Sequence, residues 1–465
     1  METRLALTAS QHKDLLNHLF PGDGLEAAAI ALCGRACSSD RRRLVVHRIH
    51  RIPYADCERD VGRVRWNTGS VVPILEEAAR RGMAIVKIHS HPTGYDQFSD
   101  VDDANDRQFF ASVYGWFDND EPHASAVMLP NGRIFARTVH VDGSFVTVPL
   151  VARIGDDLDF WFAEESNETI PEHARRSVQA FGGGTYRTMR RLRFAVTGAS
   201  GTGAFVIEQL VRSHAGSIVA IDPDRVEDKN LNRIPHTTIP DAKAGIEKVL
   251  CLAKAALSIG FEIEFIPIIG SLDNPDVMRA VSTADVAFGC MDTVDGRALL
   301  NRACTFYIIP YFDVGVTLDA DGRGGVNQIS GAIHYLQPGR SSFFTRGVFT
   351  SDEVFAAAMR RRDPDEYRKR VEAKYIRGVR EDRPAVMPVN MVFAGLVVME
   401  FLARIHRFRI DDNADYAYTL FGLSQGVYDH GPEAADCASL ARYVGRGDMR
   451  PLLDMPDFTE LSKAA

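Results

Sequence analysis

The chain has 465 residues, 45% of them hydrophobic and 25% charged, and a net charge of −8. This length exceeds one ordinary core and predicts two domains of a soluble globular protein. The acidic balance argues against nucleic-acid binding, and no apolar run is long enough to cross a membrane. We therefore expect the protein to bind neither nucleic acid nor a membrane. Seven scattered cysteines and a polar N-terminus favour a reduced, cytoplasmic protein.

The first 150 residues predict one α/β domain, in which helices and strands alternate. Helical spacing covers 5–20 and 70–81, whereas strands are expected over 26–33, 43–52 and 83–88, with a hairpin of 125–129 and 133–140. Residues 151–190 are charged and end in three glycines, which suits a connector carrying some helix.

A second α/β domain is expected over 191–465. It begins with a strand at 192–198, a glycine turn and a helix at 204–213. Further strands are expected over 217–221, 281–289 and 306–312, and an apolar helix over 391–405. The highly charged residues 352–383 are typical of a solvated helix or a loop.

One short motif directly follows the strand expected at 83–88. It reads His89-Ser90-His91, then Ser99 and Asp102, with the spacing His-x-His-x7-Ser-x2-Asp. Histidines two apart on a strand face the same way. Two imidazoles, a carboxylate and an open fourth position form the ligand set of a catalytic zinc, and the Ser99 hydroxyl can donate to a developing oxyanion.

This motif resembles the JAMM (JAB/MPN) motif of zinc isopeptidases that cut at the C-terminus of ubiquitin-like proteins. The resemblance implies a deaminase-like α/β fold in which His89, His91 and Asp102 hold zinc and Ser99 stabilises the oxyanion.

The same family takes its general base from a glutamate on an early strand, and Glu26 matches it by position. This base would take a proton from the attacking water and return it to the leaving amine. Glu76 and Glu77 are the alternatives, although their place on the helix before the motif is more typical of an exposed face.

A glycine turn opens the second domain. Gly198, Gly201 and Gly203 lie between a strand and a helix, with Ser200 where G-x-G-x-x-G has its middle glycine. Asp222 stands nineteen residues after Gly203, at the end of the next strand, where an acidic residue can bond a ribose hydroxyl. These features alone are compatible with a dehydrogenase.

The residues that follow decide against a dehydrogenase. Asp222-Pro-Asp224 leads to Asn230-Leu-Asn232-Arg233, then to Gly245-x-x-Lys248, and Asp292 follows a later strand. This order resembles the ThiF/MoeB family of ubiquitin-activating-type adenylyltransferases, which implies a Rossmann-like fold and adenylation of a C-terminal carboxylate with ATP and Mg²⁺.

The resemblance also implies a role for each motif residue. Asp222 would hold the ribose, the glycine turn would admit the nucleotide, and Asp292 would hold Mg²⁺. The phosphates would be bound by Asn230, Arg233 and Lys248. A further arginine, Arg175 or Arg176, would act in trans across a homodimer formed through this domain, whereas Arg297 is more typical of a structural residue.

The cysteines give no support for a thioester step. Family members that pass the activated protein to a thiol carry a cysteine after the core sheet, yet none lies between Cys304 and Cys437. Cys304 has an apolar context typical of a buried residue, and Cys437 is the only thiol in a polar context. The paired Cys-x-x-Cys motifs for structural zinc found in many members are also absent.

Together the two halves predict a bifunctional enzyme that cleaves at and adenylates the C-terminus of a ubiquitin-like partner with a flexible tail. Bacterial chains of this type resemble parts of ubiquitin-like conjugation systems, some linked to phage defence. One alternative is activation of a sulfur-carrier protein, with the peptidase trimming its tail. Another is a binding scaffold with a decayed domain.

Overall fold

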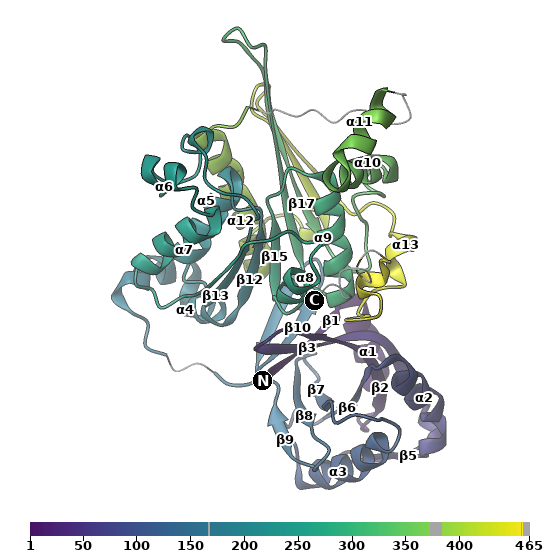
Figure 1. Cartoon of the computed structure of the whole chain (residues 1–465). Helices are drawn as coiled ribbons and strands as arrows, with labels where there is room; N and C mark the ends of the chain where they lie inside the picture. Colours follow the sequence, from purple (N-terminus) through teal and green to yellow (C-terminus); the bar gives the residue numbers. More distant parts are fainter. Residues whose placement is uncertain (166–167, 373–383, 457, 459–465) are drawn as a thin grey trace. The chain divides into compact units, whose positions relative to one another are not determined.

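The computed structural model describes residues 1–165, 168–372, 384–456 and 458 (Figure 1). The chain forms two compact α/β units, which confirms the predicted fold class. The first unit comprises Met1–Asn167 with Thr305–Ile308 and Tyr443–Thr459, and the second comprises Glu168–Cys304 with Ile309–Arg442.

The first unit is built on a mixed nine-stranded sheet with the order β11-β10-β1-β3-β2-β6-β7-β8-β9. A small hairpin, β4–β5, lies outside this sheet. The bounds are β1 (Glu2–Thr8), α1 (Ala9–Leu19), β2 (Ala28–Cys37), β3 (Arg41–Arg51), β4 (Cys57–Arg59), β5 (Val64–Trp66), α2 (Val72–Arg81), β6 (Ala84–Ser90), α3 (Asp100–Tyr114), β7 (His123–Met128), β8 (Ile134–Val139), β9 (Phe145–Thr147), β10 (Leu150–Ile154) and β11 (Leu158–Phe162).

Helices cover both faces of this sheet. Leu15 and Leu19 of α1 belong to one buried cluster, while Leu75 of α2 and Phe110 of α3 belong to the other. Residues 5–8 were expected in the first helix but lie in β1, because they are buried on both faces and pair with β3 and β10.

Residues 151–162 were expected in the connector, and this prediction is wrong. They belong to β10 and β11, which pair with each other at the edge of the first sheet. Charged residues here do not indicate a connector, because Arg153 and Asp159 face each other across the two strands and form an ion pair.

The first unit also includes residues 443–456, which we expected in the second domain. Gly34 N–H donates to the Gly445 carbonyl at 3.1 Å, and Asp448 N–H donates to the Arg35 carbonyl at 2.6 Å. These backbone pairings join segments some 400 residues apart, so no local pattern announces them.

The second unit is built on an eight-stranded sheet with the order β14-β13-β12-β15-β16-β17-β18-β19. Its strands are parallel from β14 to β16 and antiparallel from there to β19. The bounds are α4 (Arg175–Arg191), β12 (Arg193–Thr197), α5 (Gly201–Arg212), β13 (Ser217–Ile221), α6 (Ile239–Ala244), α7 (Lys248–Ser258), β14 (Glu264–Ile268), α8 (Pro275–Ser282), β15 (Val286–Gly289), α9 (Val294–Tyr307), β16 (Tyr311–Ala320), β17 (Val326–Leu336), α10 (Ser351–Arg362), α11 (Pro364–Glu372), α12 (Met387–His406), β18 (Tyr418–Gly422), β19 (Val427–Gly431) and α13 (Ala438–Ala441).

The parallel part of this sheet has helices on both faces, with α5, α7 and α12 on one side and α8 and α9 on the other (Figure 1). By length and composition α12 passes for a membrane span, yet it packs against α5, β16 and β17, as a core helix does. Residues 306–312 are not one strand, since α9 runs to Tyr307 and β16 begins at Tyr311. A short apolar run does not by itself distinguish strand from helix.

The charged segment expected over 352–383 is helical where it is described, in α10 and α11. Residues 373–383 lie outside the described residues.

Candidate metal and nucleotide sites

The two motif histidines are positioned by β6. This strand is buried along its whole length, and His89 pairs with Ala28 of the neighbouring strand β2. His91 follows directly after the strand, and its N–H donates to the Met128 carbonyl at 3.1 Å. Both residues are buried, so the side chains packed around them hold the two rings in place at the end of β6.

Asp102 comes from the first turn of α3, where Ser99 is the N-cap. The Ser99 hydroxyl accepts from Asp102 N–H at 3.2 Å, and the Asp102 carboxylate accepts from Ser99 N–H at 2.8 Å. This capping box turns the Asp102 side chain back toward the start of the helix.

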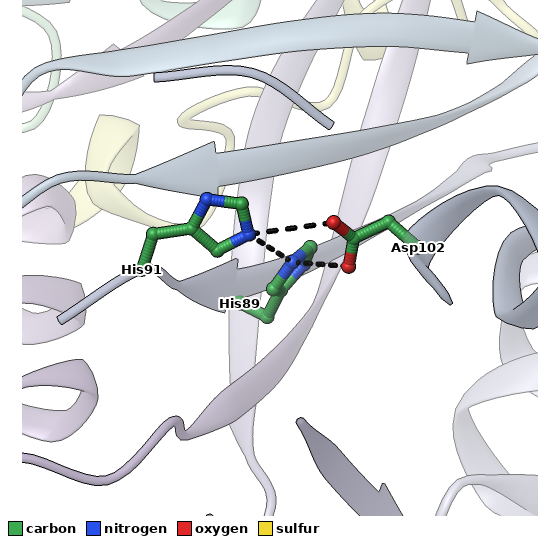
Figure 2. Close-up of side chains that lie close together, drawn as sticks. All are labelled: His89, His91 and Asp102. Carbon is green, nitrogen blue, oxygen red and sulfur yellow. Dashed lines mark hydrogen bonds and ion pairs between the residues drawn. The ribbon is translucent and has the colours of Figure 1, made fainter. Parts of the chain in front are cut away.

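The structure brings the three side chains together (Figure 2). Nε2 of His89 lies 2.9 Å from Oδ1 of Asp102 and 3.1 Å from Nε2 of His91, and His91 Nε2 lies 3.4 Å from Asp102 Oδ2. These possible ligand atoms all lie within 4.8 Å of one another. One divalent cation fits this donor set.

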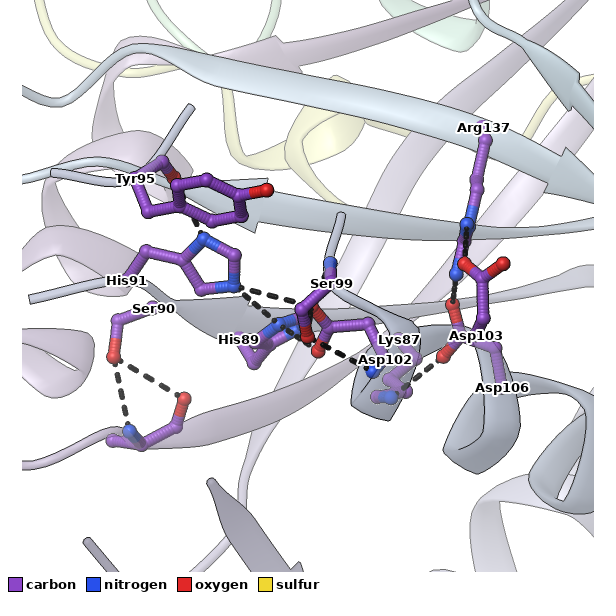
Figure 3. Close-up of polar contacts among 11 residues, drawn as sticks. Lys87, His89, Ser90, His91, Tyr95, Ser99, Asp102, Asp103, Asp106 and Arg137 are labelled. Carbon is purple, nitrogen blue, oxygen red and sulfur yellow. Dashed lines mark hydrogen bonds and ion pairs between the residues drawn. The ribbon is translucent and has the colours of Figure 1, made fainter. Parts of the chain in front are cut away.

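A second set of contacts orients these ligands (Figure 3). His91 Nδ1 donates to the Tyr95 carbonyl at 2.7 Å, which leaves the Nε2 lone pair for a metal. Ser99 Oγ donates to Asp102 Oδ2 at 2.7 Å. Burial alone would raise the pKa of Asp102, but its contacts with the His89 and His91 rings lower it, so this carboxylate is ionised and able to coordinate a cation.

Glu26 lies beside the candidate metal ligands, just before β2. Ser90 N–H donates to the Ala27 carbonyl at 3.1 Å and so continues the β2–β6 pairing beyond Ala28 and His89. This register places Glu26 opposite His91. Burial raises the pKa of Glu26 to about 8, with the His91 charge opposing the shift and the Asp102 charge adding to it.

A general base works best when its pKa is near the operating pH, so this environment suits the role expected of Glu26. The two alternatives are placed differently. Glu76 is exposed on α2, and Glu77 forms ion pairs with Arg48 and Arg81.

A buried ion cluster next to this site was not foreseen from the sequence. Lys87 Nζ lies 2.6 Å from Asp106 Oδ1, and Arg137 lies 2.7 Å from Asp106 Oδ2 (Figure 3). Arg137 also stacks on Phe98 and Phe145. The available signal was periodicity, since Lys87 shares the face of His89 on a strand and Asp106 stands one helical turn after Asp102.

In the second unit the glycine turn lies between β12 and α5, as the sequence predicts. Gly198 has a φ of +88°, a conformation that favours glycine. A Cβ on Gly203 would overlap the Gly198 carbonyl oxygen. Glycine at these two positions therefore permits a tight turn at the start of α5, and a helix N-terminus of this kind favours an anion.

Asp222 and Asp292 follow the two strands that flank β12. Because β13, β12 and β15 are parallel neighbours, the glycine turn and both aspartates lie at the same edge of the sheet. The strand order reverses at β12, and ligands bind at such switch points in α/β sheets.

Asp222 is buried and held from several sides. Its carboxylate accepts from Ala199 N–H at 2.7 Å and from Asp224 N–H at 2.9 Å, and Lys248 Nζ lies 3.7 Å away. Burial raises the pKa of Asp222, and the Lys248 charge opposes the shift. Lys248 also pairs with Asp224 at 2.6 Å, so the expected ribose and phosphate residues are brought together.

The other expected nucleotide residues lie nearby with varied contacts. Asn230 is buried and accepts from Glu227 N–H at 3.0 Å, while Arg233 donates to the Lys229 carbonyl at 2.7 Å. Asp292 is exposed. Their assigned roles remain predictions.

The expected trans arginines lie at the start of α4. Arg175 pairs with Glu172 and Arg176 donates to Gln179, both within about one helical turn. Their action across a dimer is therefore still a prediction. Arg297 forms a buried ion pair with Asp313, which accords with a structural role.

Comparison with known families accounts for both units. The model described as the ThiF family matches residues 173–435, more than half of the chain. The chain belongs to the ThiF family. A second model, described as prokaryotic homologs of the JAB domain, matches residues 8–132. Both predicted resemblances are thus confirmed, and we call the two units the JAB domain and the ThiF domain.

Similar proteins include ubiquitin-like modifier-activating enzyme 5 of Culex quinquefasciatus, 29% identical over 173 residues that cover 34% of this chain and 40% of that protein. The Drosophila persimilis enzyme of the same name is 29% identical over 171 residues, covering 34% and 42%. The chain thus spans about two fifths of the length of these relatives.

Among solved structures, Escherichia coli MccB with ATP is 17% identical with a TM-score of 0.44, covering 59% of this chain and 75% of that one. The microcin C7 biosynthetic enzyme MccB in complex with N-formylated MccA is 18% identical with a TM-score of 0.46, covering 58% and 75%.

Two thiols of the ThiF domain, Cys304 and Cys437, bear on a thioester step. Cys304 is buried in α9, as expected from its apolar context. Cys437 is also buried, although its sequence neighbours are polar, and its Sγ lies 3.2 Å from Ser439 Oγ. Burial limits the access of a bulky protein tail to this thiol and by itself would raise its pKa, but hydrogen bonds with Ser342 and Ser439 lower the pKa of Cys437 overall.

Proposed function

We propose that this chain cleaves at, and adenylates, the flexible C-terminal tail of a small ubiquitin-like protein. The observation that carries the proposal is the presence of two separate sites in one ThiF-family chain. One is the buried His89, His91 and Asp102 cluster, and the other is the glycine turn with Asp222 and Lys248 at the edge of a parallel sheet.

In the JAB domain, His89, His91 and Asp102 would hold Zn²⁺. Bound there, the ion would supply Lewis-acid polarisation of the scissile carbonyl and a more acidic water. Glu26 takes the proton of the attacking water and returns it to the leaving amine, and its burial favours the protonated form that the second transfer needs. Ser99 either donates to the oxyanion or keeps Asp102 in place, and its present bond to Asp102 favours the second role.

An open surface hollow close to this site is the candidate binding place for the tail. Its volume is about 700 Å³. It adjoins the site because the Asp60 carbonyl accepts from Glu26 N–H and because Asp100 follows Ser99. It is lined by the β4–β5 hairpin and the first turns of α3, namely Asp60, Gly62, Arg63, Arg65, Asp100, Val101, Ala104 and Asn105.

In the ThiF domain the tail carboxylate would attack the α-phosphorus of ATP, forming an acyl-adenylate and releasing pyrophosphate. Asp222 would hold the ribose, and Lys248, Arg233 and Asn230 would bind the phosphates. Asp292 would hold Mg²⁺, since it is an exposed carboxylate at the same edge as the glycine turn.

One observation favours a second candidate, the activation of a sulfur-carrier protein. No cysteine lies between Cys304 and Cys437, and Cys437 is buried. The adenylate would then be consumed by an external nucleophile, either an amine that forms a conjugate or a sulfur donor. The homodimer, the cytoplasmic location, the absence of nucleic-acid binding and the link to phage defence remain predictions.

The test is mass spectrometry of small ubiquitin-like proteins incubated with the full-length chain, zinc and Mg-ATP. We expect both a shortened tail and an adenylate. Glu26→Ala should abolish only the shortening, while retaining zinc, and Asp292→Ala should abolish only the adenylate. If no partner is shortened or adenylated by the wild-type protein, the proposal is wrong. If a partner is adenylated, formation of a lysine conjugate or of a thiocarboxylate distinguishes the two candidate functions.

A further inference from the structure

Asn390 is a buried polar residue in an otherwise apolar helix. It lies in the first turns of α12, flanked by Val389, Met391 and Val392, and its own N–H donates to the Val386 carbonyl at 3.2 Å. Only 5% of this residue is exposed. Burying an amide without full hydrogen bonding costs free energy, so a buried asparagine at this position is expected to have a hydrogen-bonding partner.

The side chain of Asn390 packs against the glycine turn of the nucleotide site. A Cβ on Gly201 would overlap Asn390 Nδ2, so Gly201 makes room for this amide. Thr202 Oγ1 donates to Asn390 Oδ1 at 3.2 Å. This bond fixes the amide plane, since its oxygen accepts from the first turn of α5.

The amide nitrogen is left with its hydrogens available. Within the described part of the chain, Thr202 is the hydrogen-bond partner of the Asn390 side chain, and it uses the oxygen alone. An amide nitrogen is only a donor, so whatever completes its bonding must accept.

The surroundings specify an anionic acceptor. Neither α5 nor α12 has a side-chain cap at its N-terminus, and helix N-termini favour negative charge. The Arg233 side chain reaches the same glycine, with its Cδ 3.3 Å from where a Gly201 Cβ would be. The nearby Asp222 carboxylate is already bound by Ala199 and Asp224 N–H groups.

We propose that Asn390 is a nucleotide-binding residue that donates from Nδ2 to a phosphate oxygen of ATP, with Thr202 as the positioning residue that orients its amide. The inference rests on the proposed adenylation function. It adds α12, a helix almost 190 residues further along the chain, to the phosphate site formed by the glycine turn.

The experiment is calorimetric titration of the full-length protein with Mg-ATP and, separately, with adenosine, which lacks the phosphates. Loss of one hydrogen bond to a charged group should weaken Mg-ATP binding about 10- to 100-fold in Asn390→Ala. Asn390→Asp, of the same shape, should weaken it at least as much because a carboxylate repels phosphate. Adenosine binding should stay within about twofold, because adenosine has no phosphate to which Asn390 could donate.

Two further variants separate binding from folding. Thr202→Val leaves Asn390 in place but removes the bond that orients it, so we expect a smaller loss for Mg-ATP and none for adenosine. Asn327→Ala is the matched control, because Asn327 is an exposed asparagine of the same domain whose amide already donates to Asp319. It should bind both ligands as the wild type does.

The outcomes distinguish this inference from the proposed function. Equal Mg-ATP affinity of the wild type and Asn390→Ala would overturn the inference alone, as would equal loss of Mg-ATP and adenosine binding. A wild-type protein that binds no Mg-ATP would overturn the adenylation function itself.

Discussion

Lys87 Nζ lies 2.6 Å from Asp106 Oδ1, and this buried ion pair joins the strand that carries His89 to the helix that carries Asp102. Arg137 binds the second oxygen of Asp106 from β8. The candidate ligands His89 and Asp102, on β6 and α3, are therefore held in register by a cluster that does not itself include a ligand. Outer contacts of this kind fix the direction of ligands and so the affinity of a metal site.

We expect Asp106→Ala to weaken zinc binding about 10- to 100-fold, the range typical of such outer contacts. It should also cost about 3–5 kcal/mol of stability, because it leaves Lys87 buried without its carboxylate. Zinc affinity by competition with a chelator and urea unfolding are the measurements. Asp14→Ala, which breaks the exposed pair with Arg51, is the control and should change neither.

Ser99 has two candidate roles that one pair of variants separates. Ser99→Ala removes the N-cap of α3 and the bond to Asp102, so it should cost about 1 kcal/mol of stability and lower zinc affinity. Ser99→Thr keeps the cap and should restore both quantities in thermal melts and zinc titrations. A Ser99→Ala protein with normal zinc affinity and slow cleavage would point instead to the oxyanion role.

His123 should make the JAB domain sensitive to acid. Burial, with a smaller contribution from the Arg35 charge, lowers the pKa of His123 to about 3, and its Nδ1 accepts from Ile85 N–H at 2.9 Å. The unfolded chain then takes up a proton near pH 6.5 while the folded chain does not, so stability falls as the pH drops from about 6.5 toward 3.

Between pH 7 and pH 5 this residue alone should remove about 2 kcal/mol from the free energy of unfolding. His123→Gln keeps an acceptor for Ile85 but cannot titrate, so its urea midpoint should fall less over the same range. Parallel pH profiles of the two proteins would contradict the assignment.

The contact between β2 and residues 443–456 can be tested with two glycines. A Cβ on Gly34 would overlap the backbone of Arg446 and Gly447, so Gly34→Ala should displace that segment and cost about 1–3 kcal/mol. Gly62→Ala meets open space and should be neutral in the same urea unfolding experiment. Faster proteolysis after residue 442 in Gly34→Ala alone would show directly that the segment has been released.

The elements predicted best were those with a strong local period. The strand at 217–221 and the hairpin of β7 and β8 were predicted at or within about two residues of their bounds, because apolar residues and turn residues agreed there. The apolar run 306–312 was misread as one strand, since such a run suits a helix end equally well. Residues 151–162 were misread because their charges pair across two strands.

The sequence by itself determined which residues could carry the proposed chemistry, because the spacing of His89, His91 and Asp102 and the order of Asp222, Lys248 and Asp292 are properties of the chain. Only the tertiary structure decided what surrounds those residues. Lys87 with Asp106, Asn390 with Gly201, and Gly34 with Gly445 meet through strand pairing and helix packing between distant segments. No local period records such contacts, since each segment obeys its own pattern whichever partner it finds.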